Sequence, residues 1–164
     1  MTTTKVYLGI GSNIDREINI RDGLEELKSR YGELQISPVY ESKAFGFDGD
    51  NFYNLVIGFN TNFGVNELEI QLREIEYQFG RRQNETRYSS RTLDIDLLLY
   101  GDLVSENHHV PRVDIIEFGF VLKPLCDIEP DLIHPVTGET MRTLWKNFDG
   151  SKHPIDQIFQ SFSL

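Results

Sequence analysis

Residues 91–101, with the sequence RTLDIDLLLYG, join a strand-like apolar run to two carboxylates. Side chains at positions i and i+2 of a β-strand point to the same face of the sheet. The apolar residues at odd positions from Leu93 to Leu99 therefore share one face, and Asp94 and Asp96 share the other. We expect the apolar face to pack on helices. The chain is thereby restricted to folds in which a sheet has one covered face and one face that carries polar groups.

Strand and helix patterns alternate along the rest of the chain. Alternating apolar residues predict strands over 5–11, 34–42 and 52–60, and the stretch above supplies a fourth. Apolar residues at helical spacing predict one helix that ends at Gly32, and a second that Asn66 caps and Gly80 ends. The resulting βαββαβ order is that of a ferredoxin-like α+β fold. We expect a mainly antiparallel sheet with helices on one face and the active site on the other.

The C-terminal third of the chain adds less regular patterns. We expect a further strand or turn region around Phe120–Leu125 and a short helix near Met141–Phe148. Residues from about 150 are expected to be weakly anchored. The sequence contains no internal repeat, low-complexity segment or linker, so residues 1–164 are interpreted as a single domain.

The composition of the chain restricts its partners. A net charge of −10 argues against a nucleic-acid polymer or an anionic membrane surface, because both call for a basic protein surface. The single cysteine, Cys126, allows no intramolecular disulfide. The N-terminus lacks the pattern of a signal peptide, and no apolar stretch approaches a membrane span. We expect a cytoplasmic protein with small-molecule substrates, and a monomer.

The aspartate pair is a candidate metal site. Two carboxylates about 7 Å apart along a strand repel each other unless a positive charge lies between them. Mg²⁺ binds one or two carboxylates and leaves its other positions to water and substrate phosphates. A pair of metals about 3.5–4 Å apart also suits such a carboxylate pair. The structural alternative is a solvated outer strand face, which fits a lone Asp-x-Asp at least as well.

Nearby arginines shift the balance toward a metal–nucleotide site. Arg81, Arg82, Arg87 and Arg91 fall within eleven residues, just before the strand of an otherwise acidic chain. Arginine binds phosphate through a bidentate fork, so carboxylates for a metal and arginines for phosphates together favour a nucleotide. Taken alone, the arginines favour a surface loop in which their positive charges balance the negative charges of neighbouring glutamates.

Glycines and aromatic residues in the N-terminal half indicate a pocket on the same face. The motif GIGSN matches neither the P-loop nor the dinucleotide-binding glycine pattern. We therefore expect Gly9 and Gly11 to leave space for a ligand or a tight turn. Phe52 and Asn54 lie on the non-core face of their strand, where a ring beside an amide suits a flat heteroaromatic ligand. A solvated strand face explains these two equally well. The loop over 42–51 is a candidate lid or an ordinary loop pinned by phenylalanines.

Taken together, these residues resemble the 6-hydroxymethyl-7,8-dihydropterin pyrophosphokinase family of folate biosynthesis. The stretch RYSSRTLDIDLLLYG is similar to the family signature Arg-Trp-Gly-Pro-Arg-Thr-Leu-Asp-hydrophobic-Asp. The stretches LGIGSN, SPVYES, FYNLVIGF, LREIEYQFGR, VPR and GFVLKPLCDIEPDLIHP extend the resemblance to nearly the whole chain. The resemblance implies a ferredoxin-like fold and the transfer of pyrophosphate from ATP to the pterin hydroxymethyl group, with release of AMP.

The resemblance also implies roles for particular residues. Two Mg²⁺ ions would lie between Asp94 and Asp96 and the ATP phosphates, with Arg81 and Arg91 as further catalytic residues. The residues implied around the nucleotide are Glu76, Arg81, Arg87, Arg91 and Leu97, the last near the adenine. The residues implied at the pterin pocket are Ser42, Lys43, Phe45, Phe52, Asn54, Tyr88 and Phe120. The phenylalanines would supply stacking and apolar walls, and Asn54 would bond the pterin edge.

The chain departs from the family pattern at several loop positions. Tyr88-Ser89-Ser90 replaces Trp-Gly-Pro, which alters an aromatic lid and leaves the loop less stiff. Arg112 stands where the family often has a histidine after Val-Pro. Residues 116–118 stand where it usually has an arginine, and Lys43 where it favours proline. These changes leave the metal site intact, and Arg112 or Arg82 would compensate for lost phosphate contacts.

Two alternatives to the family reaction stay open at this point. A diverged relative would keep the metal site but act on another pterin or an alcohol, which the altered loop positions favour. A non-catalytic module would bind the nucleotide or the pterin without releasing AMP.

Overall fold

The computed structural model describes residues 2–81, 90–151, 153–158 and 162. In chain order its elements are β1 (Thr4–Ser12), α1 (Arg16–Tyr31), β2 (Gln35–Ile36), β3 (Val39–Ser42), β4 (Phe52–Thr61), α2 (Val65–Gln78), β5 (Asp94–Tyr100), α3 (Asp114–Glu117), α4 (Gly119–Ile128), α5 (Met141–Lys146) and β6 (Ile155–Ile158). The two long helices and the short helix α5 agree with the prediction.

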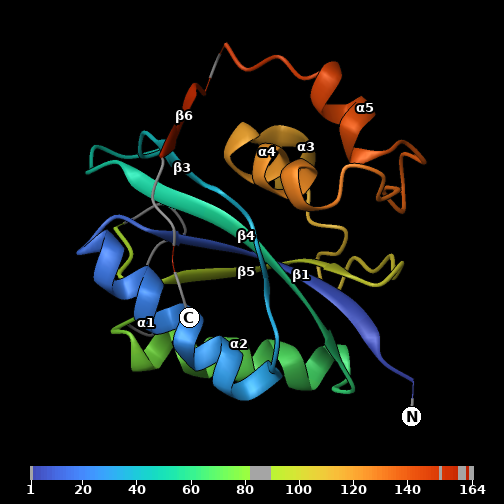
Figure 1. Ribbon diagram of the computed structural model, residues 1–164, viewed down its shortest axis with the longest axis horizontal. Coiled ribbons are helices and arrows are strands. Elements are labelled where there is room, and N and C mark those ends of the chain that lie inside the picture. The colour runs from blue at the N-terminus through green and yellow to red at the C-terminus, as the bar shows by residue number, and fades with distance from the viewer. Residues whose placement is uncertain (1, 82–89, 152, 159–161, 163–164) are drawn as a thin grey trace.

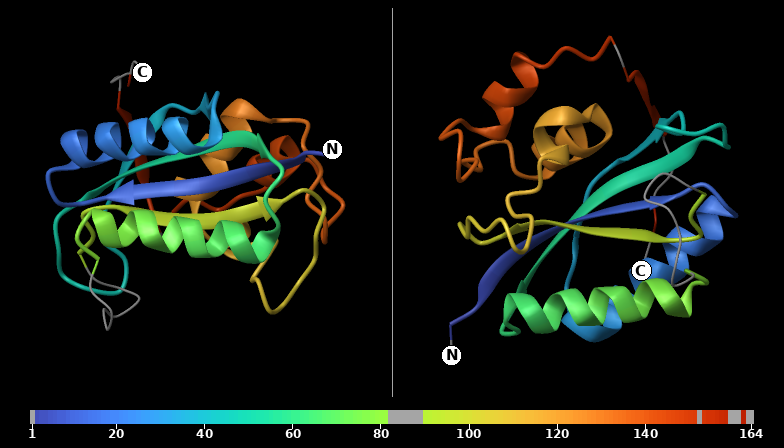
Figure 2. Two further views of the ribbon diagram at one scale, coloured as in Figure 1. Left: turned by 90° about the horizontal axis from the view of Figure 1, so that it is seen from below. Right: turned by 180° about the vertical axis from the view of Figure 1, so that it is seen from behind.

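The strands form one sheet in the order β5-β1-β4-β3-β6, with β2 paired to β4. Every pairing is antiparallel. Helices α1 and α2 cover one face of this sheet, and α3, α4 and α5 lie on the opposite side, as Figures 1 and 2 show. The ferredoxin-like α+β fold is confirmed, and α4 packs over part of the face that we expected to be left to the site.

Apolar side chains from both helix layers bury the two faces of the sheet. The first core joins α1 and α2 to the sheet, and its fully buried members include Leu24, Ile57 and Ile75. The second core joins α4 to the opposite face and includes Val56 and Leu122. Each such side chain contributes about 1.5–3 kcal/mol when it is removed from water. The two cores leave one end of the second face for the polar residues of β5.

A β-bulge in β5 changes which face its side chains reach. Leu8 of β1 pairs with Leu97, whereas the preceding Tyr7 pairs with Leu99, so Leu98 is an extra residue. Leu97 lies in the core under the helices, and both Leu98 and Leu99 lie in the core under α4. The expectation that Leu99 shares the face of Leu97 is therefore wrong, because a bulge shifts the two-residue alternation by one position.

The predicted strand over 34–42 is two strands. Pro38 has no backbone N–H to give to a ladder, and the hydroxyl of Ser37 accepts a hydrogen bond from the backbone N–H of Val56 at 2.8 Å. The chain therefore leaves the β4 ladder briefly and rejoins it as β3. The predicted cap of the second helix is also wrong, since α2 begins at Val65 and Asn66 lies exposed in its first turn.

The segment from Phe120 to Leu125 belongs to a helix rather than to the predicted strand or turn. Its buried residues Val121, Leu122, Leu125 and Cys126 recur at helical spacing on the face that packs against the sheet. Valine, phenylalanine and proline suggested otherwise, because each is disfavoured in helix interiors. Tertiary burial of the apolar stripe outweighs that weak local preference.

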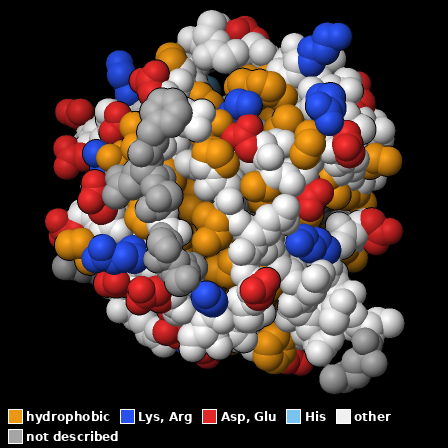
Figure 3. All heavy atoms as spheres, in the orientation of Figure 1, with side chains coloured by type: hydrophobic (Ala, Val, Ile, Leu, Met, Phe, Trp, Pro, Cys, Tyr) orange, Lys and Arg blue, Asp and Glu red, His pale blue; other side chains and the backbone are white. Residues whose placement is uncertain are grey.

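Residues 155–158 are tied to the sheet, whereas we expected the chain from about 150 to be weakly anchored. Strand β6 pairs with β3, and its Ile158 lies opposite Val39. Figure 3 shows acidic and basic side chains scattered over one face of the molecule with hydrophobic ones between them. In the part of the chain that the structure describes, no helix is both long and apolar enough to cross a membrane.

Candidate active site

A cavity of about 370 Å³ lies on the sheet face that bears the aspartate pair. Its walls come from β1, β3, β4 and β5, from the C-terminal part of α2, and from α3 and α4. The predicted site residues that line it are Ser42, Lys43, Phe45, Phe52, Asn54, Glu76, Arg81, Arg91, Asp94, Asp96, Arg112 and Phe120. Residues from five distant parts of the sequence are thus brought together around one space.

Among the described residues, one predicted site residue does not line this cavity. Leu97 is 8% exposed and lies in the core under α1 and α2, so the structure does not support its predicted place beside the adenine. Arg87 and Tyr88 lie outside the described residues, and so does Arg82.

Glycines of β1 make room for the carboxylates of β5. Gly11 pairs with Asp94, and Gly9 pairs with Asp96, so each aspartate has a residue without a side chain beside it on the neighbouring strand. A Cβ atom at Gly11 would lie 3.3 Å from Oδ1 of Asn54, which is tighter than ordinary contact. Both glycines line the cavity, in agreement with their predicted role of leaving space for a ligand.

Carboxyl groups and arginines lie side by side at the aspartate end of the cavity. Burial, followed by the charge of Glu76, raises the pKa of Asp94 from 3.8 to about 6, although Arg91 and Arg112 act in the opposite direction. The environment of Asp94 therefore disfavours its anion on balance, which is the situation that a bound cation relieves. Among the described residues no cluster of three metal-ligating side chains occurs. A Mg²⁺ ion here would rely on the aspartate pair, water and phosphates, which matches its usual coordination.

Glu76 joins α2 to β5 at the edge of the cavity. Its side chain is 3% exposed, and its two oxygens accept hydrogen bonds from different partners. Oε2 accepts from the backbone N–H of Ile95 at 2.9 Å, and Oε1 accepts from Nη1 of Arg81 at 2.7 Å. Burial raises the pKa of Glu76, while these two donors lower it. Glu76 therefore lines the site as a buried anchor that fixes the direction of Arg81.

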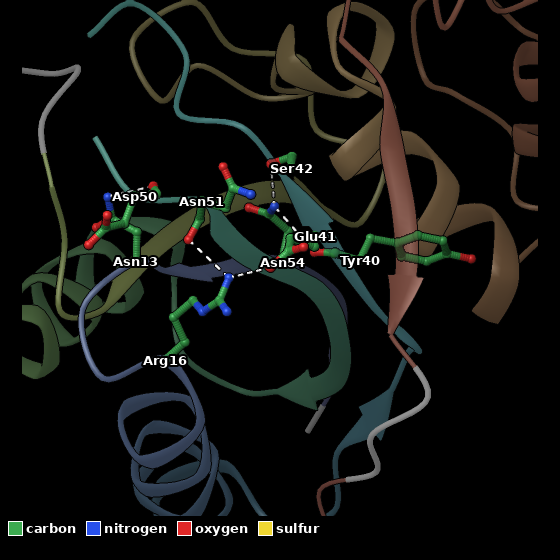
Figure 4. A network of polar contacts seen from close by, with 8 residues as sticks. All are labelled: Asn13, Arg16, Tyr40, Glu41, Ser42, Asp50, Asn51 and Asn54. Carbon is green, nitrogen blue, oxygen red and sulfur yellow. Dashed lines mark hydrogen bonds and ion pairs between the residues drawn. The ribbon is translucent and has the colours of Figure 1, made fainter. Parts of the chain in front are cut away.

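Asn13 fixes the backbone of Arg91. Its Oδ1 accepts from the backbone N–H of Arg91 at 2.7 Å, and its Nδ2 donates to the carbonyl of Asp50 at 3.1 Å and to Oγ of Ser90 at 3.2 Å. Figure 4 shows Asn13 next to Asp50 at the end of the loop over 43–51. The end of β1, this loop and the segment before β5 are thus connected by one buried amide.

Arg16 holds the same loop from the other side. Its Nη1 lies 2.6 Å from Oε2 of Glu41 and donates to the carbonyl of Asn51 at 3.2 Å, and both contacts are drawn in Figure 4. The guanidinium also lies 3.7 Å from the ring centroid of Tyr53. The first residue of α1 therefore connects the loop to β3 and β4.

The opposite end of the cavity is apolar with a single buried amide. Nδ2 of Asn54 donates to Oγ of Ser42 at 2.8 Å, as Figure 4 shows, which fixes the amide plane. Phe118 stacks on Phe120 with ring centroids 4.9 Å apart and meets Phe45 edge-on at 4.9 Å. Aromatic walls around a fixed donor and acceptor suit a planar heterocycle.

Sequence reasoning missed several cavity residues, chiefly Arg73, Asp114 and Phe118. Arg73 lies one turn before Glu76 on α2, at 3.8 Å from Oε1 of Glu76, and that helical spacing was a usable signal. Asp114 lies two residues after Arg112, and the ion pair between them is 3.3 Å long. Phe118 precedes a helix that was not predicted, so its direction was not foreseeable.

The chemistry of the cavity defines a class of enzyme. Paired carboxylates and several arginines at one end suit a metal-bound polyphosphate. Aromatic rings and an amide at the other end suit a planar acceptor. The site is therefore that of a transferase that moves a phosphate-containing group onto a heterocyclic substrate.

The profile of the 7,8-dihydro-6-hydroxymethylpterin-pyrophosphokinase family matches residues 7–130, and the chain belongs to this family. A 2-amino-4-hydroxy-6-hydroxymethyldihydropteridine pyrophosphokinase of Aquifex aeolicus is 38% identical over 135 residues, which cover 80% of this chain and 84% of that one. The folic acid synthesis protein fol1 of Pneumocystis carinii is 38% identical over 138 residues, which cover 81% of this chain.

Structural comparison supports the same fold. The crystal structure of Plasmodium falciparum HPPK-DHPS A437G with STZ-DHP aligns with a TM-score of 0.67 at 15% identity, over 88% of this chain. The alignment covers 45% of the Plasmodium chain and, in sequence, 18% of the Pneumocystis protein. These relatives are therefore much longer than the present chain.

Proposed function

We propose that the chain transfers pyrophosphate from ATP to the hydroxymethyl group of 6-hydroxymethyl-7,8-dihydropterin and releases AMP, as a step of folate biosynthesis. The observation that carries this proposal is the single cavity that joins Asp94 and Asp96 to arginines at one end and to Asn54 and aromatic rings at the other. Membership of the pyrophosphokinase family supports it. ATP is the co-substrate, and residues 1–164 act as one domain.

The reaction needs one bond to form and one to break. The acceptor hydroxyl oxygen attacks the β-phosphorus of ATP, the bond from that phosphorus to the oxygen of the α-phosphate breaks, and AMP leaves with that oxygen. The hydroxyl proton passes to water. Such a transfer requires in-line positioning and charge neutralisation more than covalent help from the protein.

The acidic end of the cavity provides the charge chemistry. Asp94 and Asp96 would hold two Mg²⁺ ions, which when bound neutralise the phosphates and polarise the attacked phosphorus. Arg91 and Arg81 bind phosphate oxygens, and Glu76 keeps Arg81 in place through the 2.7 Å bond described above. Arg87 and Arg112 complete the proposed nucleotide contacts.

The aromatic end holds the acceptor. The Nδ2 group of Asn54 is engaged by Ser42, so the carbonyl oxygen of the same amide is placed to accept hydrogen bonds from the pterin edge. Phe45, Phe52 and Phe120 enclose the ring system. Lys43 and Tyr88 are further proposed contacts. Fixing the amide before the acceptor binds reduces the entropy cost of ordering it.

The test is an assay with ATP, Mg²⁺ and the hydroxymethyl-dihydropterin, in which AMP and the pterin diphosphate are measured. Asp94→Ala and Asp96→Ala should each nearly abolish both products. Asp102→Ala is the matched control, because Asp102 is exposed just beyond the same strand, and it should keep full activity. Turnover that survives both active-site changes would remove the metal assignment.

A second candidate is the same reaction on a different acceptor. Phe118 adds a further ring beside Phe45 and Phe120 at the acceptor end, and Lys43 lines it where the family favours proline. A panel of pterins and simple alcohols separates the two candidates, and a strong preference for the hydroxymethyl-dihydropterin rules out the second. AMP release in either case excludes a non-catalytic binding module.

We also propose that the protein is a monomer and that it is located in the cytoplasm. Light scattering coupled to gel filtration tests the first, and cell fractionation tests the second. A dimer whose interface covers the cavity would contradict the site as proposed.

A further inference from the structure

Arg112 connects two carboxylates that line the cavity from different elements, β5 and α3. Its backbone N–H donates to the carbonyl of Leu98 at 2.9 Å, so the residue is docked beside β5. Its Nη2 lies 3.5 Å from Oδ1 of Asp96, and its Nε lies 3.3 Å from Oδ2 of Asp114 at the start of α3. One guanidinium therefore lies next to a proposed metal ligand and next to a second aspartate, which is almost fully buried.

The attraction between Arg112 and these aspartates outweighs the cost of burying the guanidinium. Burial lowers the pKa of Arg112, but Asp96, then Asp114, raise it by more, so that the net shift is upward. A divalent cation that binds Asp96 must compete with this guanidinium, because two cations close to one carboxylate repel each other.

On the basis of the function proposed above, we propose that Arg112 is the counter-ion of Asp96 in the ligand-free protein. Metal and nucleotide displace it from Asp96 when they bind together. Asp114 is the positioning residue, and its carboxylate remains paired with the Nε edge of the guanidinium. The Nη groups are then free to turn from Asp96 to a phosphate of the nucleotide, which arginine binds through the same fork.

This arrangement couples metal binding to nucleotide binding. A metal alone must displace Arg112 without offering it a new partner, so it binds weakly. A nucleotide brings phosphates that accept Arg112, so metal and nucleotide bind better together than apart. Such coupling is reciprocal for the two affinities. Removing the charge of Arg112 must therefore tighten the binding of metal alone and weaken the binding of the nucleotide.

The test measures both affinities. Mn²⁺ is titrated into the nucleotide-free protein and followed by electron paramagnetic resonance, and a non-hydrolysable ATP analogue is titrated at saturating Mn²⁺ by calorimetry. Arg112→Gln should bind Mn²⁺ alone about fivefold more tightly and the analogue about tenfold more weakly. Arg112→Lys keeps the charge and should bind Mn²⁺ alone close to the wild-type value.

Two further variants separate the parts of the proposal. Asp114→Asn leaves Arg112 charged but without its tether, so the analogue should bind more weakly while Mn²⁺ alone gains nothing. Arg142→Gln is the matched control for loss of one arginine, because Arg142 pairs with Asp131 at 3.0 Å on the exposed surface, and it should change neither affinity.

Unchanged or weaker Mn²⁺ binding in a folded Arg112→Gln variant overturns the inference, because a merely structural arginine would lower both affinities together. Turnover of the wild-type protein in the same preparation shows whether the proposed function holds. Wild-type turnover with no gain in Mn²⁺ affinity refutes this inference alone. Opposite shifts in the two affinities without wild-type turnover refute the proposed function and leave the counter-ion role in place.

Discussion

Asp94→Asn should stabilise the metal-free protein at neutral pH while abolishing its activity. The pKa of Asp94 is raised from 3.8 to about 6 in the folded protein, chiefly by burial and by Glu76. The folded protein therefore holds this proton more tightly than the unfolded chain does. The stability linked to it is fully present below about pH 4 and is lost as the pH rises through about 6. Asparagine has no charge to bury, so the variant avoids that loss.

The size of the effect on the free energy of unfolding follows from the shift in the pKa of Asp94. One pKa unit corresponds to about 1.4 kcal/mol, so the ionised carboxyl costs the fold at most about 3 kcal/mol above pH 6. Solvent contact of the half-buried Asp94 side chain reduces this to about 1–2 kcal/mol. For a chain of this length each 1 kcal/mol changes Tm by about 2–4 °C.

The measurement is urea unfolding followed by circular dichroism in the presence of a chelator, at pH 4.5 and pH 7.5. Asp94→Asn should exceed the wild type in free energy of unfolding at the higher pH and match it more closely at the lower pH. Adding Mg²⁺ should raise the stability of the wild type but not of the variant. Asp102→Asn, at an exposed position just beyond the same strand, is the control. A variant that is no more stable than the wild type at pH 7.5 in chelator would refute this reasoning.

Three other changes have defined outcomes. Glu76→Gln removes the charge that holds Arg81 but keeps an acceptor for Ile95, so the KM for ATP should rise several-fold while the KM for the acceptor changes little; an unchanged KM for ATP would contradict its anchoring role. Phe118→Leu shortens the aromatic wall, so the KM for the acceptor should rise several-fold while the KM for ATP stays within about twofold, and equal changes in both would exclude a specific effect on the acceptor. Burial lowers the pKa of His134, whose Nδ1 accepts two backbone N–H bonds. The folded protein thus binds fewer protons there than the unfolded chain, and stability should drop as the pH falls below about 6.5; in His134→Gln the loss between pH 7.5 and pH 5 should be smaller, and an equal loss would argue against it.

The polar face of β5 was predictable because it depends only on a period of two. Asp94 and Asp96 must lie on the same face of any regular strand. The apolar residues at the alternate positions indicate that the other face is the buried one. The glycines of β1 were interpreted correctly for a similar reason, since only a residue without a side chain leaves space at a pairing position. Local rules of this kind need no knowledge of the tertiary structure.

Other parts of the site depend on contacts between distant segments. Leu99 was assigned to the wrong face because the bulge at Leu98 arises from pairing with β1, which the sequence of β5 alone does not encode. Helix α4 was missed because its helical stripe is short and rich in residues with weak helix preference. Asp114 in α3 and Phe118 just before α4 line the cavity because these helices lie over this face of the sheet, so no local signal pointed to them.

The pairing of β5 with β1 also protects the chain from misfolding. A slip of one residue along β1 would turn Asp94 and Asp96 toward α1 and α2 and bring leucines into the cavity. Two carboxylates would then be buried without partners, at a cost of several kcal/mol each. The two aspartates on which the chemistry depends thus also disfavour a misaligned pairing of β5 with β1 during folding. Replacing both with apolar residues should therefore lead to alternative pairings and aggregation as well as to loss of activity.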